Sequence, residues 1–77
     1  MMKELLEHMA KHLVDDASSV TVSEVLGEQT TVLKLRVAKD DVGKVIGKQG
    51  NTAKAIRTIM SAASSKTRRR TVLEILD

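Results

Sequence analysis

The order of patterns along the chain predicts an α+β domain in which helices cover one face of a three-stranded mixed sheet. Three segments are rich in β-branched residues that alternate between apolar and polar side chains, as in strands, and three segments repeat apolar residues at helical spacing. These segments follow the order α-β-β-α-α-β. In a chain of 77 residues they must share one core, so we expect residues 1–77 to form a single domain.

The first predicted element is an amphipathic helix over residues 2–14. Its apolar residues recur every three or four positions, and Glu4 lies near the N-terminal end, where a negative charge is favourable. The apolar residues are Met2, Leu5, Leu6, Met9 and Leu13.

Two strands are predicted next, over residues 19–26 and 30–38. The turn between them, residues 27–29, is short, so the strands should form an antiparallel hairpin. In the second strand the apolar residues alternate with Lys34 and Arg36, which we expect on the exposed face.

The second half of the chain predicts two helices and a last strand. Asp40 is a candidate N-cap for a short helix, a longer helix runs over residues 51–64, and the strand spans residues 71–76. The crossover to the last strand passes through both helices, which allows it to run parallel to the second strand, so the sheet should be mixed. The residues expected to face inward on the longer helix are Ile56, Met60 and Ala63.

The composition favours a small domain with an aliphatic core. Hydrophobic residues make up 42% of the chain, yet it has no Phe, Trp or Tyr. It also lacks Cys, which excludes disulfides and thiolate metal sites. No apolar run approaches a membrane span, and the first residues do not read as a signal peptide. We therefore expect a soluble, intracellular protein without a cofactor or a membrane partner.

The charge is distributed unevenly. Residues 1–28 carry a net charge of −4 and residues 29–77 one of +7. Between Val42 and Arg70 the chain has eight basic residues and no acidic one. Such a stretch suits a polyanion such as nucleic acid, although a solvated basic surface would look the same.

The turn Gly47-Lys48-Gln49-Gly50 lies between the two later helices. The start of the second helix offers unpaired backbone N–H groups and the positive end of the helix dipole, and glycine lets a phosphodiester backbone come close to those amides. Lys48 adds a charge and Gln49 a hydrogen-bonding amide. A Walker-type nucleotide loop is excluded, because three residues separate Gly43 from Gly47 and Gln49 stands where Ser or Thr would bind Mg²⁺.

The segment Val45-Ile46-Gly47-Lys48-Gln49-Gly50, followed by Ile56, resembles the signature of the KH domain, whose GXXG loop clamps the backbone of about four nucleotides. The element order resembles that of a type II KH domain, and the run from Gly43 to Thr58 is most similar to the bacterial single-domain KhpA family.

We therefore expect a binding protein for single-stranded RNA. The loop would hold the RNA backbone, the apolar residues just before it would form a wall or its support, and the polar residues around it would add contacts. The residues expected to contact RNA are Gly47, Lys48, Gln49, Gly50, Lys44, Val45, Ile46, Asn51, Lys54 and Arg57.

The resemblance to the KhpA family implies further properties. Its members are cytoplasmic and are thought to act as RNA chaperones or post-transcriptional regulators. They self-associate and partner with a larger KH protein of the KhpB or Jag type, and in some bacteria the pair influences cell elongation, cell shape and envelope homeostasis, which includes cell wall biogenesis.

Three other features have two readings each. His8 and His12 are spaced as metal ligands can be, but no third ligand is evident, and a solvated helix face is the favoured reading. The basic run of Lys66 and residues 68–70 either contacts RNA or only keeps a loop soluble. Ile59 lies beside the inward stripe of its helix and either closes that stripe or is an exposed anchor for a homodimer.

Three other classes of function remain as alternatives. A helix-turn-helix protein would place the second helix in a major groove of DNA. A protein–protein adaptor would keep the KH fold without binding RNA. An enzyme is the least favoured class, because no pairing of nucleophile, base and orienting group is evident.

Overall fold

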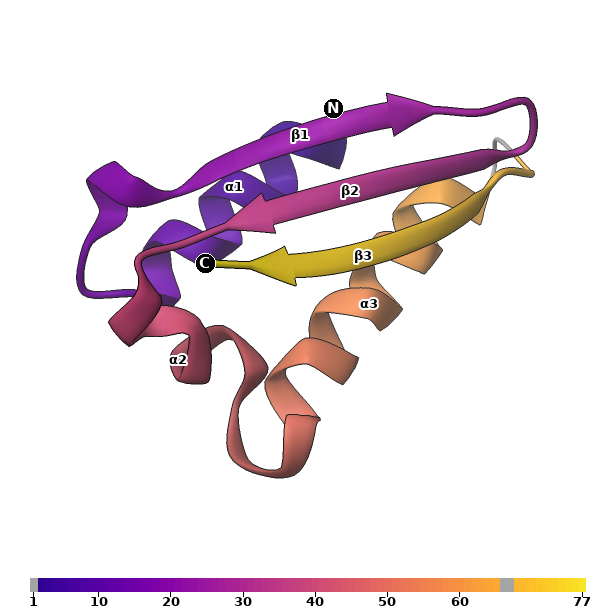
Figure 1. Cartoon of the computed structure of the whole chain (residues 1–77). Helices are drawn as coiled ribbons and strands as arrows, with labels where there is room; N and C mark the ends of the chain where they lie inside the picture. The colour runs from indigo at the N-terminus through magenta and orange to yellow at the C-terminus, as the bar shows by residue number, and fades with distance from the viewer. Residues whose placement is uncertain (1, 66–67) are drawn as a thin grey trace.

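The computed structural model describes residues 2–65 and 68–77. The elements follow the predicted order α-β-β-α-α-β, and single 3-10 turns lie before β1, before α2 and between α2 and α3 (Figure 1). The helices and strands are α1 (Met2–Leu13), β1 (Thr21–Leu26), β2 (Thr30–Arg36), α2 (Val42–Ile46), α3 (Asn51–Ser64) and β3 (Arg70–Leu76). The 3-10 turns are η1 (Ala17–Ser19), η2 (Lys39–Asp41) and η3 (Lys48–Gly50).

The strands form one sheet in the order β1-β2-β3. β1 and β2 are antiparallel and pair Val22 with Leu35, whereas β2 and β3 are parallel and pair Leu33 with Leu73. The mixed sheet predicted from the helical crossover is confirmed. β3 lies at an edge of the sheet, which leaves one side of this strand open to the site described below.

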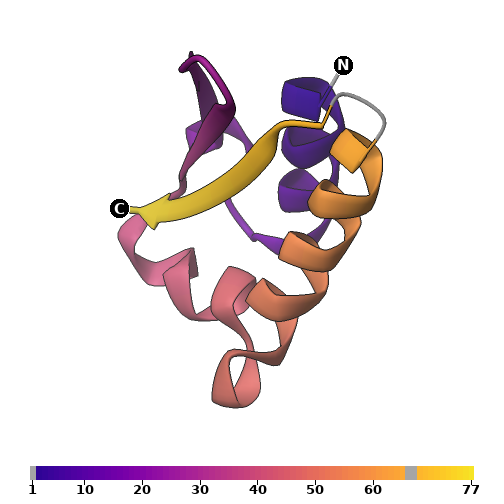
Figure 2. The same ribbon diagram turned by 90° about the vertical axis from the view of Figure 1, so that its right-hand side faces the viewer.

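The helices lie on one face of the sheet. Figures 1 and 2 show α1 and α3 against this face and α2 near the ends of β2 and β3, so the α+β layering is as predicted. The core between helices and sheet is aliphatic, and each large side chain buried there contributes about 1.5–3 kcal/mol. Its buried members are Leu6, Ala10, Val20, Val22, Leu33, Leu35, Val37, Val45, Ile56, Met60 and Leu73.

On α1 the buried stripe is narrower than the apolar pattern. Leu6 and Ala10 are fully buried, while Leu5 and Leu13 remain 37% and 38% exposed. Leu5 lies at the margin of the stripe and Leu13 in the last turn of the helix, where each keeps contact with solvent.

On α3 the prediction that Ala63 faces inward is wrong. The buried positions are Ala53, Ile56, Met60 and Ser64, and Ala63 is exposed. The helix directs Ser64 at the sheet, where its hydroxyl accepts a hydrogen bond of 2.7 Å from the Thr71 hydroxyl. Because its polar group is satisfied, a buried serine is tolerated at this position.

The predicted N-cap at Asp40 is also wrong. Asp41 is the residue that precedes α2, and its carboxylate is directed toward the segment after α1 instead of capping its own helix. The strand β1 begins at Thr21, two residues later than expected, because Ala17–Ser19 forms η1. There the Asp16 carboxylate accepts hydrogen bonds from Ser18 and Ser19, at 2.7 and 2.6 Å.

Candidate nucleic-acid interface

The two glycines of the Gly47–Gly50 loop have backbone conformations that residues other than glycine rarely adopt. Gly47 lies at φ 77° and ψ 174°, a region open essentially to glycine alone. A Cβ on Gly47 would also lie 2.1 Å from the hydroxyl oxygen of Thr52. Gly47 is therefore required by the backbone and by its packing on α3, independently of any ligand.

Gly50 differs from Gly47 in its surroundings. Its backbone is left-handed, at φ 76° and ψ 10°, but no atom lies within 4 Å of the position that a Cβ would take. Gln49, between them, is also left-handed, with φ 57°. The backbone conformation thus favours glycine at both positions. Only at Gly50 is the space next to the backbone open to a ligand.

The loop projects from the end of the molecule where α2 meets α3, and Figure 1 shows it at the lowest point. Lys48, Gln49 and Asn51 are exposed there. α3 has no side-chain cap at its start, and the Asn51 N–H is bonded to the Lys48 carbonyl. The positive dipole end of α3 and the backbone N–H groups that follow Asn51 in its first turn are therefore not covered by a capping side chain.

An open groove of about 510 Å³ lies beside the loop. One wall comes from the end of α2 and the first two turns of α3, and the other from the second half of β3. The lining residues are Ile46, Gly50, Ala53, Lys54, Arg57, Leu73, Glu74, Ile75 and Leu76.

The β3 wall of the groove is a free strand edge. Arg70 donates its N–H to Gln29, and the Leu76 carbonyl accepts from Val37, so the even-numbered residues of β3 direct their backbone groups at β2. Backbone groups alternate in direction along a strand, so those of Leu73 and Ile75 point away from β2. Within the described residues β3 has a strand neighbour on one side only, and these N–H and C=O groups face the groove.

The structure brings four of the predicted RNA contacts together in the groove: Ile46, Gly50, Lys54 and Arg57. Val45 is fully buried and supports the wall from the core. The contribution of β3 was missed by sequence analysis. Residues 71–76 have an ordinary strand pattern, and only the position of β3 in the sheet gives it an open edge.

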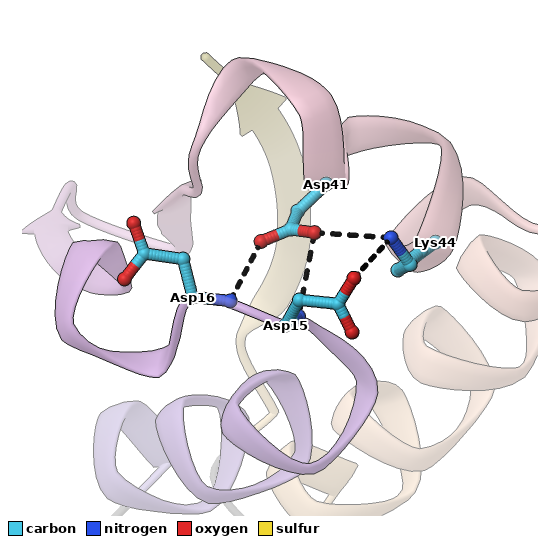
Figure 3. A network of polar contacts seen from close by, with 4 residues as sticks. All are labelled: Asp15, Asp16, Asp41 and Lys44. Carbon is cyan, nitrogen blue, oxygen red and sulfur yellow. Dashed lines mark hydrogen bonds and ion pairs between the residues drawn. The ribbon is translucent and has the colours of Figure 1, made fainter.

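Lys44 does not line the groove, and its ammonium group is held by two carboxylates (Figure 3). Its Nζ lies 2.8 Å from Oδ2 of Asp15 and 3.3 Å from Oδ1 of Asp41. These hydrogen bonds, first the one to Asp15, raise the pKa of Lys44 above its usual value. Its charge is therefore compensated within the protein.

Asp41 is the centre of this network. The residue is 3% exposed, and its carboxylate accepts hydrogen bonds from the backbone N–H groups of Asp16 and Asp15, at 3.0 and 3.3 Å. The hydrogen bond from Asp16 is the main cause that holds the pKa of Asp41 below its usual value; burial opposes it, and the bonds from Asp15 and Lys44 add to it.

Within the basic run, Arg69 has a structural partner. Its guanidinium donates to the Thr31 hydroxyl at 3.0 Å and to the carbonyls of Thr30, Glu28 and Gly27, so it grips the β1–β2 turn. Arg68 and Arg70 are exposed, and Lys66 lies outside the described residues. Figure 1 shows this turn at the opposite end of the molecule from the Gly47–Gly50 loop.

Ile59 is 44% exposed on the outer side of α3. On α1, His12 Nδ1 lies 2.8 Å from the His8 carbonyl oxygen, and the two rings are 4.4 Å apart. Residues 2–65 and 68–77 contain no group of three or more His, Cys, Asp or Glu placed to hold a metal ion. Over the same residues, no helix has the length and apolar character needed to cross a membrane.

Comparison with known proteins gives full-length matches. The family model described as KhpA/KhpB, KH domain matches residues 3–75. Similar relatives, each named RNA-binding protein KhpA, come from Clostridium acetobutylicum and Aquifex aeolicus. The first is 59% identical over 97% of this chain and 100% of its own length, and the second is 50% identical over 99% and 96%.

Among solved structures, a crystal structure of an Aquifex aeolicus Era variant bound to GDP·AlF4⁻ is similar, with a TM-score of 0.63 at 21% identity. The match covers 97% of this chain and 29% of the Era chain. The likeness shows that this fold also occurs as one part of a longer protein.

Proposed function

Since the chain belongs to the KhpA/KhpB family of KH domains, we propose that it binds single-stranded RNA at the Gly47–Gly50 loop and the groove beside it. We place this activity in one domain formed by residues 1–77. One observation carries the proposal. The start of α3, which has no side-chain cap and carries basic residues, faces the open edge of β3 across an aliphatic groove.

The loop suits the phosphodiester backbone. The open side of Gly50 lets a phosphate approach the first amides of α3, whose N–H groups and dipole favour an anion. Lys48 supplies a charge in the loop, and Lys54 and Arg57 supply charges one and two turns along α3. Gln49 and Asn51 add exposed amides for hydrogen bonds to phosphate or sugar.

The groove suits unstacked bases. Ile46 and Ala53 give an apolar surface for a base, while the free N–H and C=O groups of Leu73 and Ile75 give donors and acceptors for its edge. Since the chain has no Phe, Trp or Tyr and neither histidine lines the groove, bases in the groove cannot be stacked on side-chain rings. We therefore expect weak affinity and low sequence selectivity for one domain.

The length of the groove limits the site. Leu73–Leu76 span about 10 Å along β3. Beyond them, the Ser64–Thr71 hydrogen bond draws α3 onto β3. We expect a site for about four nucleotides, as in other KH domains.

The test is a substitution of Lys48 and Gln49 together by Asp. Both side chains are exposed, and Asp tolerates the left-handed backbone of Gln49, so the fold should persist. The added negative charges would face phosphate, and RNA binding should be lost. Lys3→Asp with Gln29→Asp makes the same charge change on exposed residues elsewhere and should bind nearly as wild type does. Equal affinity of the loop variant and this control would overturn the site.

A duplex-DNA reader of the helix-turn-helix type is the alternative to this proposal. The exposed side of α3 presents Lys54 and Arg57 among small and aliphatic residues, which offers little for reading base edges. Single-stranded RNA and duplex DNA of equal length should therefore be compared at one salt concentration. Tighter binding of the duplex would favour the alternative, and binding of neither would favour an adaptor that contacts only proteins.

The family extends the proposal to cellular roles. We infer a cytoplasmic RNA chaperone or post-transcriptional regulator, without enzymatic activity, that acts as a homodimer or with a larger KhpB/Jag-type partner. A contribution to cell elongation and envelope homeostasis belongs to the same inference. Crosslinking of the protein to RNA in cells, followed by sequencing, tests the regulatory role through the transcripts it recovers.

A further inference from the structure

The loop that is proposed to hold phosphate follows α2, a helix too short to be stable on its own. α2 has five residues, and an isolated helix of that length is unstable in water. The direction of the Gly47–Gly50 loop therefore depends on what α2 is attached to. On the core side the attachment is Val45, which is fully buried.

The second attachment of α2 is polar and leads to the end of α1. Asp41, just before α2, binds the backbone N–H groups of Asp15 and Asp16, which follow α1. Lys44, in the middle of α2, bridges the carboxylates of Asp15 and Asp41. Figure 3 shows the side chains of Lys44, Asp15 and Asp41 converging between these segments.

We propose that Asp41 and Lys44 are positioning residues for RNA binding. Through Asp15 and Asp16 they hold α2, and with it the Gly47–Gly50 loop, in the geometry that accepts RNA. Lys44 acts within the protein and does not contact phosphate. This inference rests on the proposed function, and it assigns Lys44 a role different from the direct contact expected from the sequence.

The geometry separates this role from a simple charge effect. Lys44 is not among the residues that line the groove, and to reach a phosphate its ammonium group would have to leave two carboxylates. For a substitution of Asp41, the two roles predict opposite changes in RNA affinity. Removing a negative charge should strengthen binding to a polyanion, whereas loss of a positioning residue should weaken it.

The first experiment compares Asp41→Asn with Asp40→Asn, using a fluorescein-labelled, mixed-sequence single-stranded RNA of about eight nucleotides, twice the length that one KH domain clamps. Both variants lose one negative charge, but the Asp40 side chain is exposed and has no hydrogen bond or ion pair among the described residues. Asp41→Asn should weaken binding about fivefold or more, because RNA would then have to order at least one backbone residue that the network holds in place in the wild type. Asp40→Asn should bind as tightly as wild type or slightly more tightly. Equal or tighter binding by Asp41→Asn would overturn the proposal.

The second experiment compares Lys44→Met with Lys48→Met across salt concentrations. Each phosphate contact on a single strand adds about 0.7 to the slope of log affinity against log salt. Lys48→Met should lower this slope by about that amount. Lys44→Met should weaken binding while leaving the slope as in wild type, and Lys44→Arg should restore affinity. A reduced slope in Lys44→Met, or an unchanged affinity, would overturn the positioning role.

A third measurement follows the loop itself. In Lys44→Met, amide hydrogen exchange should speed up at Gly47 and Gly50, whose N–H groups are bonded to Gly43 and Gly47. The amides of β2 should be unchanged. Uniformly faster exchange would indicate a loss of global stability instead, and would overturn the proposal. If Asp41→Asn proves unfolded by circular dichroism, Lys44→Met decides the case.

Failure of this inference is distinct from failure of the proposed function. If wild type binds the RNA probe and Lys48→Met lowers the salt slope, the proposed RNA site is supported. The positioning role of Asp41 and Lys44 is then decided only by the variants at residues 41 and 44. If wild type does not bind the probe, the proposed function itself fails.

Discussion

Gly47 and Gly50 stand three residues apart, but different constraints act on them. A side chain at Gly47 would need a backbone open only to glycine and would collide with Thr52. A side chain at Gly50 would meet open space, and the left-handed backbone alone would cost about 1–2 kcal/mol. Gly47→Ala should therefore lower the free energy of unfolding by about 3 kcal/mol or more, the sum of backbone strain and a forced shift in packing.

Gly50→Ala should separate binding from folding. We expect a folded protein, destabilised by about 1–2 kcal/mol, whose new methyl group lies at the mouth of the groove and weakens RNA binding. Urea unfolding of Gly47→Ala and Gly50→Ala measures the two losses of stability, and RNA titration of Gly50→Ala measures its loss of binding. Equal losses of stability at the two positions would contradict the packing role of Thr52.

Asp41 should make the stability of the domain sensitive to acid. Because its pKa is lower when folded than the usual value of about 3.9, its carboxylate stabilises the fold above that pH, and this stabilisation is lost as pH falls through the folded pKa. Asp16, whose pKa is lowered by the hydroxyls of Ser19 and then Ser18, acts in the same window. The wild type should therefore lose melting temperature below about pH 4 more steeply than Asp41→Asn.

The acid prediction is checked by thermal melting at neutral pH and at several values below about pH 4. At neutral pH, Asp41→Asn should already melt lower, because its amide presents a donor to one of the two backbone N–H groups. Parallel pH profiles for the two proteins would show that Asp41 has no special share in acid unfolding.

At the scale of elements, Arg69 joins two parts of the sheet that are distant in sequence. From the position just before β3, its guanidinium donates hydrogen bonds to carbonyls of the β1–β2 turn and to the hydroxyl of Thr31. Hydrogen bonds from a charged donor contribute about 1.5–3 kcal/mol. Arg69→Met should therefore lower the free energy of unfolding by about that amount and leave the salt slope of RNA binding unchanged.

The matched control for Arg69 is Arg68→Met, which removes the same charge from an exposed neighbour. Its stability should stay within about 0.5 kcal/mol of wild type. If Arg68→Met and Arg69→Met lose stability equally, the hairpin contacts of Arg69 contribute nothing of their own.

The elements could be predicted from sequence because their patterns are local. Alternation placed β2 and β3 within two residues of their ends, and α3 has the predicted bounds, Asn51–Ser64. What escaped prediction depends on tertiary placement. Ser64 faces the sheet because Thr71 gives it a partner, the edge of β3 opens onto the groove because of strand order, and Lys44 meets an aspartate 29 residues away.

The same limit applies to the proposed site. The GXXG loop and its flanking cations are contiguous in sequence, so a motif could indicate them. The wall formed by Leu73–Leu76 has no motif, because its contribution is made by backbone groups that every residue possesses. The sequence pattern could therefore indicate where phosphate is proposed to bind, but it contained no signal for where a base would be read.

At the scale of the whole molecule, we propose that α3 forms the interface with a second copy. Ile59 is 44% exposed, and Ser61, Ala62 and Ala63 beside it are exposed and small, so two α3 helices could approach closely about a two-fold axis. Such a dimer would carry two Gly47–Gly50 loops and would bind a longer RNA more tightly without new contacts. Because Ile59 lies outside the core, Ile59→Asp should leave the domain folded.

We therefore expect Ile59→Asp to sediment as a folded monomer, with weaker binding to an RNA long enough to span two loops and little change for a four-nucleotide ligand. Thr58→Asp is the control, since it adds the same charge to an exposed neighbour on α3. It should remain dimeric, because its side chain points about 100° away around the helix. A folded Ile59→Asp variant that stays dimeric, or a wild type that is monomeric at high concentration, would exclude this interface. Equal weakening for short and long RNA would instead show that the substitution acts on the groove, and that avidity has no part in binding.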